Sequence, residues 1–134
     1  MENNLVVKAN DLVQARYELS LNEQKIILYA VSKLDEKQED FNIIKLDIRE
    51  FFKLLGTSKE RYSEIREIVK ELREKTLIIN TDEGELITGW LASMFYKKNT
   101  GTIELEFSKK LVPYLLQLKR KFTRYQLKNI LYLS

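Results

Sequence analysis

Charged side chains between Lys59 and Lys75 fall on separate faces of a predicted helix. At about 100° of rotation per residue, the basic residues gather along one side of that helix. This basic arc consists of Lys59, Ser63, Arg66, Lys70 and Arg73. Arginine and lysine on one helix face can neutralise phosphates or donate hydrogen bonds to guanine in the major groove of DNA. The basic arc therefore predicts a contact to DNA.

The same helix carries an apolar arc and an acidic arc. The apolar arc, which should face the core, consists of Tyr62, Ile65, Ile68, Val69 and Leu72. The acidic arc consists of Glu60, Glu64, Glu67 and Glu71. Arg66 and Lys70 are like-charged neighbours four residues apart, and only Glu71 with Lys75 has the stabilising Glu-to-Lys spacing. We infer a partner for each charged face; the alternative is an outer face that is only solvated.

Two predicted hairpin tips differ in charge. The first tip, residues 82–85, has the acidic sequence Asp-Glu-Gly-Glu, which would repel phosphate. The second tip, residues 97–100, begins with Lys97 and Lys98. Exposed lysines in a loop can bind the phosphate backbone without reading bases. The second tip is therefore the predicted DNA contact of the two.

The C-terminal end of the chain is strongly basic. Residues 1–107 hold 16 basic residues against 20 acidic ones, whereas residues 108–134 hold seven basic residues and no acid. This asymmetry favours a polyanionic partner over the alternative of a solubilising tail. The predicted phosphate contacts here are Lys119, Arg120, Lys121 and Arg124. The nearby Phe122 and Tyr125 are assigned to the core.

The composition argues against catalysis. The chain has no cysteine and no histidine, which excludes zinc sites built from these residues and nucleophiles assisted by histidine. It has no GxxxxGK[ST] phosphate loop, so ATP hydrolysis has no visible site. We expect no enzymatic activity, no catalytic residue, no cofactor and no metal.

The elements that would position these charges begin with a helix after Ser20. Ser20 and Glu23 form a capping box, and apolar residues then repeat at helical spacing as far as Leu34. A strand is predicted over Phe41–Leu46. Asp47 and Glu50 form a second candidate capping pair, for a helix that ends near Leu55 and Gly56.

The second half of the chain predicts strands and one further helix. Apolar and β-branched residues predict strands over Leu77–Asn80, Leu86–Tyr96 and Thr102–Phe107. These strands would form a β-hairpin or a three-stranded meander. Ser108 can cap the following helix, which tolerates Pro113 only in its first turns.

This order of elements predicts an α+β fold, a winged helix-turn-helix with a small antiparallel β-sheet or hairpin. One domain is expected over residues 1–121, because no repeat or flexible linker divides it. The apolar runs are far shorter than the roughly 20 residues of a membrane-spanning helix. The N-terminus lacks the basic segment and apolar core of a secretion signal. We therefore expect a cytoplasmic protein with no membrane partner.

The whole sequence resembles the family of plasmid replication initiators that bind iterons, the direct repeats at a plasmid origin. The resemblance is strongest over Asn10–Leu34, NDLVQARYELSLNEQKIILYAVSKL, and continues through Tyr62–Ile79 and Thr102–Leu127. It implies a protein of two winged-helix domains, of which this chain matches the first. Residues 122–134 would then begin the linker helix to a second domain that is absent from this chain.

The resemblance also implies function and partners. In such initiators a monomer binds iterons and helps to open the origin, whereas a dimer commonly represses the initiator's own promoter. We therefore expect a DNA-binding and dimerisation domain whose partners are double-stranded origin DNA, a second copy, and host replication proteins. Two alternatives stay open: a winged-helix transcriptional regulator, and a protein-interaction module that does not bind DNA on its own.

Overall fold

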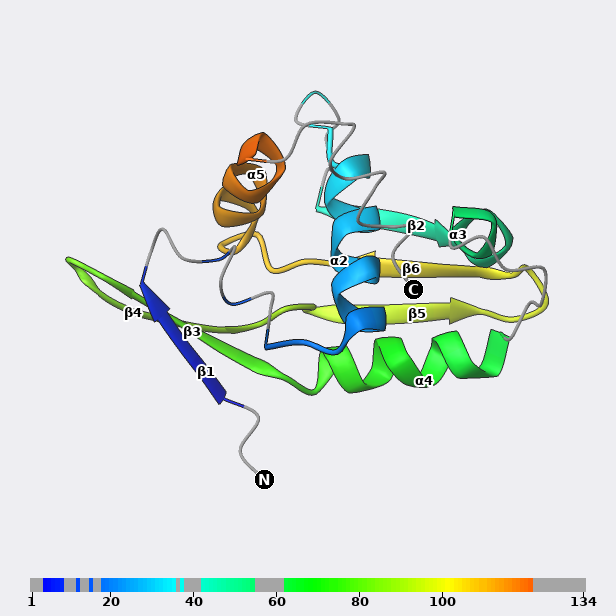
Figure 1. Ribbon diagram of the computed structural model, residues 1–134, viewed down its shortest axis with the longest axis horizontal. Coiled ribbons are helices and arrows are strands. Elements are labelled where there is room, and N and C mark those ends of the chain that lie inside the picture. Colours follow the sequence, from blue (N-terminus) through cyan, green and yellow to red (C-terminus); the bar gives the residue numbers. More distant parts are fainter. Residues whose placement is uncertain are drawn as a thin grey trace.

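A computed structural model describes residues 4–8, 12, 15, 18–35, 37, 42–54 and 62–121 of the chain. Its central part is the winged helix that the sequence predicts, with helices on one face of a three-stranded sheet (Figure 1). In chain order its elements are α2 (Leu21–Lys33), β2 (Ile43–Asp47), α3 (Ile48–Leu54), α4 (Tyr62–Arg73), β5 (Ser93–Lys97), β6 (Thr102–Glu106) and α5 (Val112–Lys121).

The winged-helix sheet is antiparallel, with the strand order β2-β6-β5. Ile44 lies opposite Leu105 and Leu46 lies opposite Ile103, and all four side chains are buried. The alternate residues of β6 are only partly exposed, which confirms the predicted alternation along this strand. The sheet therefore packs one face on the helices and leaves the other towards solvent.

A second sheet lies beside the winged helix and was not predicted as a separate unit. It has the order β1-β3-β4 and consists of β1 (Asn4–Lys8), β3 (Thr76–Thr81) and β4 (Gly84–Gly89). β3 and β4 form an antiparallel hairpin, whereas β1 pairs with β3 in parallel. β1 itself was not predicted. Its partner β3 is parallel and lies some 70 residues away, so no turn in the neighbouring sequence indicates the strand.

The single strand predicted over Leu86–Tyr96 is wrong, because the chain changes sheets within it. β4 ends at Gly89, and β5 begins at Ser93. Trp90 and Leu91, which occupy the break, are each 1% exposed and belong to the core. A β-carbon on Gly89 would lie 3.0 Å from the Leu91 carbonyl oxygen and 3.4 Å from that of Lys75. This backbone approach is tighter than most β-carbons meet, so the break favours glycine at position 89.

The capping box of α2 is confirmed. The Glu23 amide donates to Ser20 Oγ (3.2 Å), and the Ser20 amide donates to Glu23 Oε1 (2.8 Å). Lys75 does not pair with Glu71 as its spacing suggested, since α4 ends at Arg73 and Lys75 lies beyond it. Instead Lys75 Nζ donates to Glu23 Oε1, so the carboxylate joins α2 to the segment between α4 and β3.

The other predicted caps are confirmed in part. Asp47 Oδ1 accepts the Glu50 amide (3.0 Å), but the Glu50 carboxylate pairs with Lys33 (2.9 Å) instead of reaching back. Pro113 is the second residue of α5, as its missing N–H requires. α2 and α3 therefore start at the predicted residues, whereas α5 begins at Val112, after a turn that follows the predicted cap Ser108.

The core is centred on α2, whose residues from Ile26 to Val31 are buried. Tyr29 packs edge-on against Phe51 of α3, with ring centroids 5.5 Å apart. This burial, together with the negative charge of Glu50, raises the pKa of Tyr29 from 10.0 to about 12. The phenol thus stays neutral at physiological pH and acts as a core residue.

We expect Gly89→Ala to lower the free energy of unfolding by about 1–3 kcal/mol, because the added methyl group would lie 3.0 Å from a backbone oxygen that must shift to admit it. Urea denaturation measures this change. Asn80→Ala on the exposed side of β3 is the control and should stay within about 0.5 kcal/mol of the original chain. Equal stability of the two variants would contradict the close approach at Gly89.

We expect Ser20→Ala to destabilise the chain by about 1 kcal/mol through loss of one cap. Glu23→Ala should cost more, about 2–3 kcal/mol, because it removes the second cap and the charged partner of Lys75. Thermal and urea unfolding of both variants, with Asn22→Ala as the exposed control, test this ranking. The reverse order would show that the link to Lys75 adds nothing.

Candidate nucleic-acid interface

The apolar arc of α4 faces the core as predicted at the four residues whose side chains are described, whereas the side chain of Tyr62 lies outside the described residues. Ile65 is 3% exposed, and Val69 and Leu72 are fully buried. Because these residues fix the rotation of the helix, the residues between them must lie outside. The predicted helix over Lys59–Lys75 is confirmed as α4 over Tyr62–Arg73; Glu74 and Lys75 lie beyond its end, and residues 59–61 lie outside the described residues.

The outer side of α4 carries Arg66, Lys70 and Arg73 of the predicted basic arc, all exposed. Arg66 is paired with Glu67 of the acidic arc at 3.0 Å, and both side chains are about half exposed. An exposed pair of this kind is worth at most about 1 kcal/mol, so a phosphate can replace the carboxylate. Lys59 lies outside the described residues, as does the side chain of Ser63.

The β5–β6 hairpin is the wing, and the conformation of its tip is set by a hydrogen-bonded turn. Thr100 Oγ1 donates to the Lys97 carbonyl (2.9 Å), and both Asn99 (φ 63°) and Gly101 (φ 68°) have left-handed backbone. Lys97 Nζ lies 3.1 Å from Glu104 Oε2, so its charge is partly neutralised. Lys98 is exposed at the tip. The wing therefore offers Lys98 most directly to a ligand.

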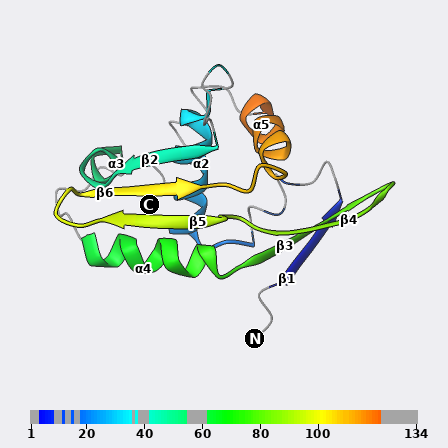
Figure 2. The same ribbon diagram turned by 180° about the vertical axis from the view of Figure 1, so that it is seen from behind.

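The wing tip and the beginning of α4 lie at the same end of the molecule. α4 runs beside β5, and the turn after β5 lies near the first turn of α4 in both opposite views (Figures 1 and 2). α3 joins this end, because the Ile48 amide donates to the Gly101 carbonyl (3.0 Å). The acidic tip of the β3–β4 hairpin lies at the opposite end. We call the end formed by α3, the start of α4 and the wing tip the wing end.

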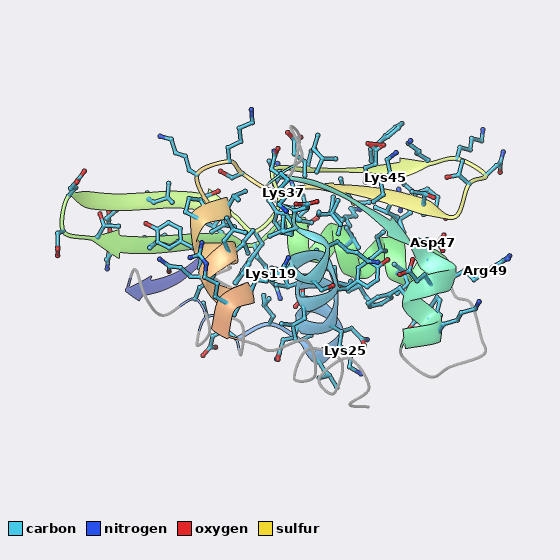
Figure 3. The ribbon with its side chains drawn as sticks, turned by 90° about the horizontal axis from the view of Figure 1, so that it is seen from above. Lys25, Lys37, Lys45, Asp47, Arg49 and Lys119 are labelled. Atoms are coloured by element: carbon cyan, nitrogen blue, oxygen red, sulfur yellow. The ribbon has the colours of Figure 1, made fainter. Side chains whose placement is uncertain are left out.

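The predicted contacts on α5 are not brought to the wing end. Figure 3 labels Lys119 on α5, away from Arg49 on α3. Lys119 is partly buried, and its Nζ donates to the carbonyl of Leu34, the C-cap of α2. Arg120 is exposed and has an interaction of its own, whereas the side chain of Lys121 and the whole of Arg124 lie outside the described residues. Lys119, which was predicted to contact phosphate, thus makes a hydrogen bond within the protein.

Two basic residues on α3 were not predicted as DNA contacts. Arg49 and Lys53 are exposed and lie four residues apart on this short helix. Figure 3 shows Arg49 pointing outward at the wing end. Their spacing was visible in the sequence, but only the hydrogen bond between Ile48 and Gly101 shows that α3 adjoins the wing.

Other kinds of site find no support in the described part of the chain. The described residues contain no group of three or more Asp, Glu, His or Cys side chains that could hold a metal ion. Among the helices found there, none is long and apolar enough to cross a membrane.

A family model and two curated relatives match most of this chain. The family model described as "Initiator Replication protein, WH1" matches residues 5–134. A replication initiation protein from Escherichia coli is 30% identical over 133 residues, covering 94% of this chain and 41% of that protein. An uncharacterised 27.6 kDa protein from Escherichia coli is 24% identical, covering 92% of this chain and 58% of that protein. The chain thus spans about half the length of these curated relatives.

Two solved structures have the same fold. The WH1 domain of a replication protein isolated from a multiple sclerosis patient has a TM-score of 0.66 and 22% identity, covering 87% of this chain and 95% of that one. The Pi initiator protein, solved with iteron DNA, has a TM-score of 0.72 and 19% identity, covering 93% of this chain and 56% of that one.

The winged-helix prediction is therefore confirmed by both the architecture and these structures. With its family model matched from residue 5 to residue 134, the chain belongs to the initiator replication proteins and corresponds to their WH1 domain.

Proposed function

We propose that this WH1 domain binds the DNA of a plasmid origin and helps an initiator to start replication there. The observation that carries the proposal is the placement of the basic side of α4 and the lysines of the wing on neighbouring elements, with the acidic hairpin tip at the far end. The related Pi initiator protein, whose structure was solved with iteron DNA, supports repeats of this kind as the ligand.

The chemistry available at this surface favours the phosphate backbone over base reading. Each lysine or arginine that replaces a counterion on DNA contributes to binding without sequence information. The glutamates beside the basic arc, Glu67 and Glu71, are exposed and would repel phosphate if α4 lay deep in the groove. α4 is thus better suited to contact the backbone along one side than to read bases across its whole outer face.

Base reading and assembly would then involve other parts of a longer initiator. In this proposal a second winged-helix domain, joined through residues 122–134, reads much of the iteron sequence, and host replication proteins join at the origin. The WH1 domain acts in the cytoplasm, as a non-enzymatic module without a cofactor. It also self-associates, and the resulting dimer of the initiator would repress the promoter of the initiator's own gene.

A second candidate function is a domain devoted mainly to protein interaction. The exposed Glu64, Glu67 and Glu71 favour it, as does the excess of acidic residues before residue 108. A winged-helix transcriptional regulator would use the same surface on a different DNA target. Comparison of origin repeats with unrelated DNA separates these functions.

We expect the double variant Arg66→Ala/Lys70→Ala to bind a duplex iteron more weakly than the original chain. The slope of the logarithm of the association constant against that of the salt concentration should become shallower by about 2, because two phosphate contacts are lost. Fluorescence anisotropy at several salt concentrations measures both quantities. Circular dichroism should show an unchanged fold, since both side chains are exposed.

The matched control removes the same charge elsewhere. Lys109→Ala/Lys110→Ala changes two exposed lysines in the turn before α5, which follows the end of β6 farther from the wing. We expect this control to keep the original slope. Equal loss of DNA affinity in both variants would show that binding depends only on net charge. A lack of salt dependence in the original chain would reject phosphate binding.

A further inference from the structure

Phe95, in the middle of β5, is 61% exposed and is the only exposed residue among the described aromatic side chains. Its neighbours Met94 and Tyr96 pack against the core, so Phe95 lies on the outer face of the winged-helix sheet. In the cross-strand register it lies in one row with Glu104 of β6 and Lys45 of β2. The helices of the winged helix cover the opposite face of this sheet (Figure 1).

The basic side of α4 is turned towards this outer face. Successive helix residues are about 100° apart, so the basic and acidic arcs flank the buried stripe of α4 on opposite sides. Lys75 continues the acidic side beyond the helix and reaches Glu23 at the start of α2. Because α2 lies on the covered face of the sheet, the basic side faces the other way. α4 runs beside the edge strand β5, so Arg66, Lys70 and Arg73 adjoin the outer face of that strand.

Phe95 therefore lies between two groups of positive charge. The basic side of α4 lies along one side of it, and the exposed Lys98 follows three residues later at the wing tip. Glu104 and Glu106 of β6 share the outer face, although Glu104 pairs with Lys97 (3.1 Å). These glutamates disfavour phosphate over the middle of the sheet. A DNA backbone thus fits along β5 and α4, where Phe95 would face it.

We propose that Phe95 is an apolar contact to duplex DNA, which packs on sugars and bases in a minor groove whose phosphates are bound by the basic side of α4 and by Lys98. This inference rests on the proposed function and adds a contact that its charged residues do not supply. The minor groove is about 6 Å wide, so neighbouring elements can reach the phosphates on both of its rims. An apolar ring gains nothing from phosphate, and its favourable surface on DNA is that of the sugars and bases.

Such a contact also has a consequence for the duplex. Proteins that bind the minor groove often insert phenylalanine or another apolar side chain between base steps, which partly unstacks the bases. The ring of Phe95 would then couple binding to a local loosening of the DNA. The charged residues hold the backbone in place while this occurs.

The affinity of Phe95→Ala and its salt dependence test the contact. Loss of a stacked aromatic ring should weaken the binding of a duplex iteron by about tenfold or more. The slope of the logarithm of the association constant against that of the salt concentration should stay the same, because phenylalanine displaces no counterion. Fluorescence anisotropy measures both quantities. The unchanged slope separates Phe95 from Arg66 and Lys70, whose loss makes the slope shallower.

Ile43→Ala is the matched control for this variant. Ile43 is an exposed apolar residue (37%) on the same face, but it lies on β2 at the opposite edge of the sheet. This control should bind DNA as the original chain does. Thermal unfolding of Phe95→Ala should change little, since the side chain is exposed. Phe95→Tyr, which keeps the ring, should retain most of the affinity.

Phe95→Trp tests whether the ring meets the bases. Trp90, the one tryptophan of the chain, is 1% exposed and gives a constant background of emission. We expect duplex iteron to quench the emission of the new indole, because an aromatic side chain in this place stacks on bases. Ile43→Trp, on the far edge of the same face, should keep its emission when the DNA is added.

Three outcomes would overturn the proposal: salt-dependent binding that Phe95→Ala leaves unchanged, an equal loss of affinity in Phe95→Ala and Ile43→Ala, or equal quenching of the two tryptophan variants. None of these outcomes affects the proposed function, which depends on the charged residues. An original chain that binds no duplex iteron even at low salt would reject the proposed function and this contact with it. The two failures are therefore distinguishable.

Discussion

The arrangement of the helices depends on the contacts made by the buried carboxylate of Glu23. One oxygen of a side chain that is 1% exposed accepts both the Ser20 amide and the ammonium of Lys75. A carboxylate in the first turn of a helix is also stabilised by the helix dipole. Because Lys75 follows α4 directly, this contact fixes the start of α2 against the end of α4. The buried residues Ile65, Val69 and Leu72 then set the rotation of α4, so its basic side faces outward.

Local signals in the sequence predicted the helices well because their causes are local. The Ser20–Glu23 box, the apolar spacing of α4 and the position of Pro113 all act within one or two turns. The second sheet could not be predicted in this way. The run from Leu86 to Tyr96 contains apolar residues suited to one long strand, and its break depends on backbone atoms of Lys75 and Leu91 close to Gly89.

From the sequence, the types of residue at the candidate site could be predicted, but the contacts that their side chains make could not. The sequence identified the basic side of α4 and the wing, but not which charges already have partners. Lys97 pairs with Glu104 across the hairpin, and Lys119 bonds to the Leu34 carbonyl 85 residues away. Such partners depend on tertiary structure, as does the approach of α3 to the wing. A count of basic residues therefore overstates the charge available on the wing and on α5. It also does not reveal that α3 brings further basic residues to the wing end.

The position of the β3–β4 hairpin in the chain keeps its acidic tip away from the wing. In the order of a winged helix, α4 is followed by the wing strands, and here the hairpin is inserted between α4 and β5. The chain leaves from the far end of α4 and returns at Trp90 and Leu91, which are buried. β5 then runs back along α4, so its turn comes to lie at the wing end. The acidic hairpin tip therefore lies at the other end of α4 from the wing, where it does not repel a phosphate bound at the wing end.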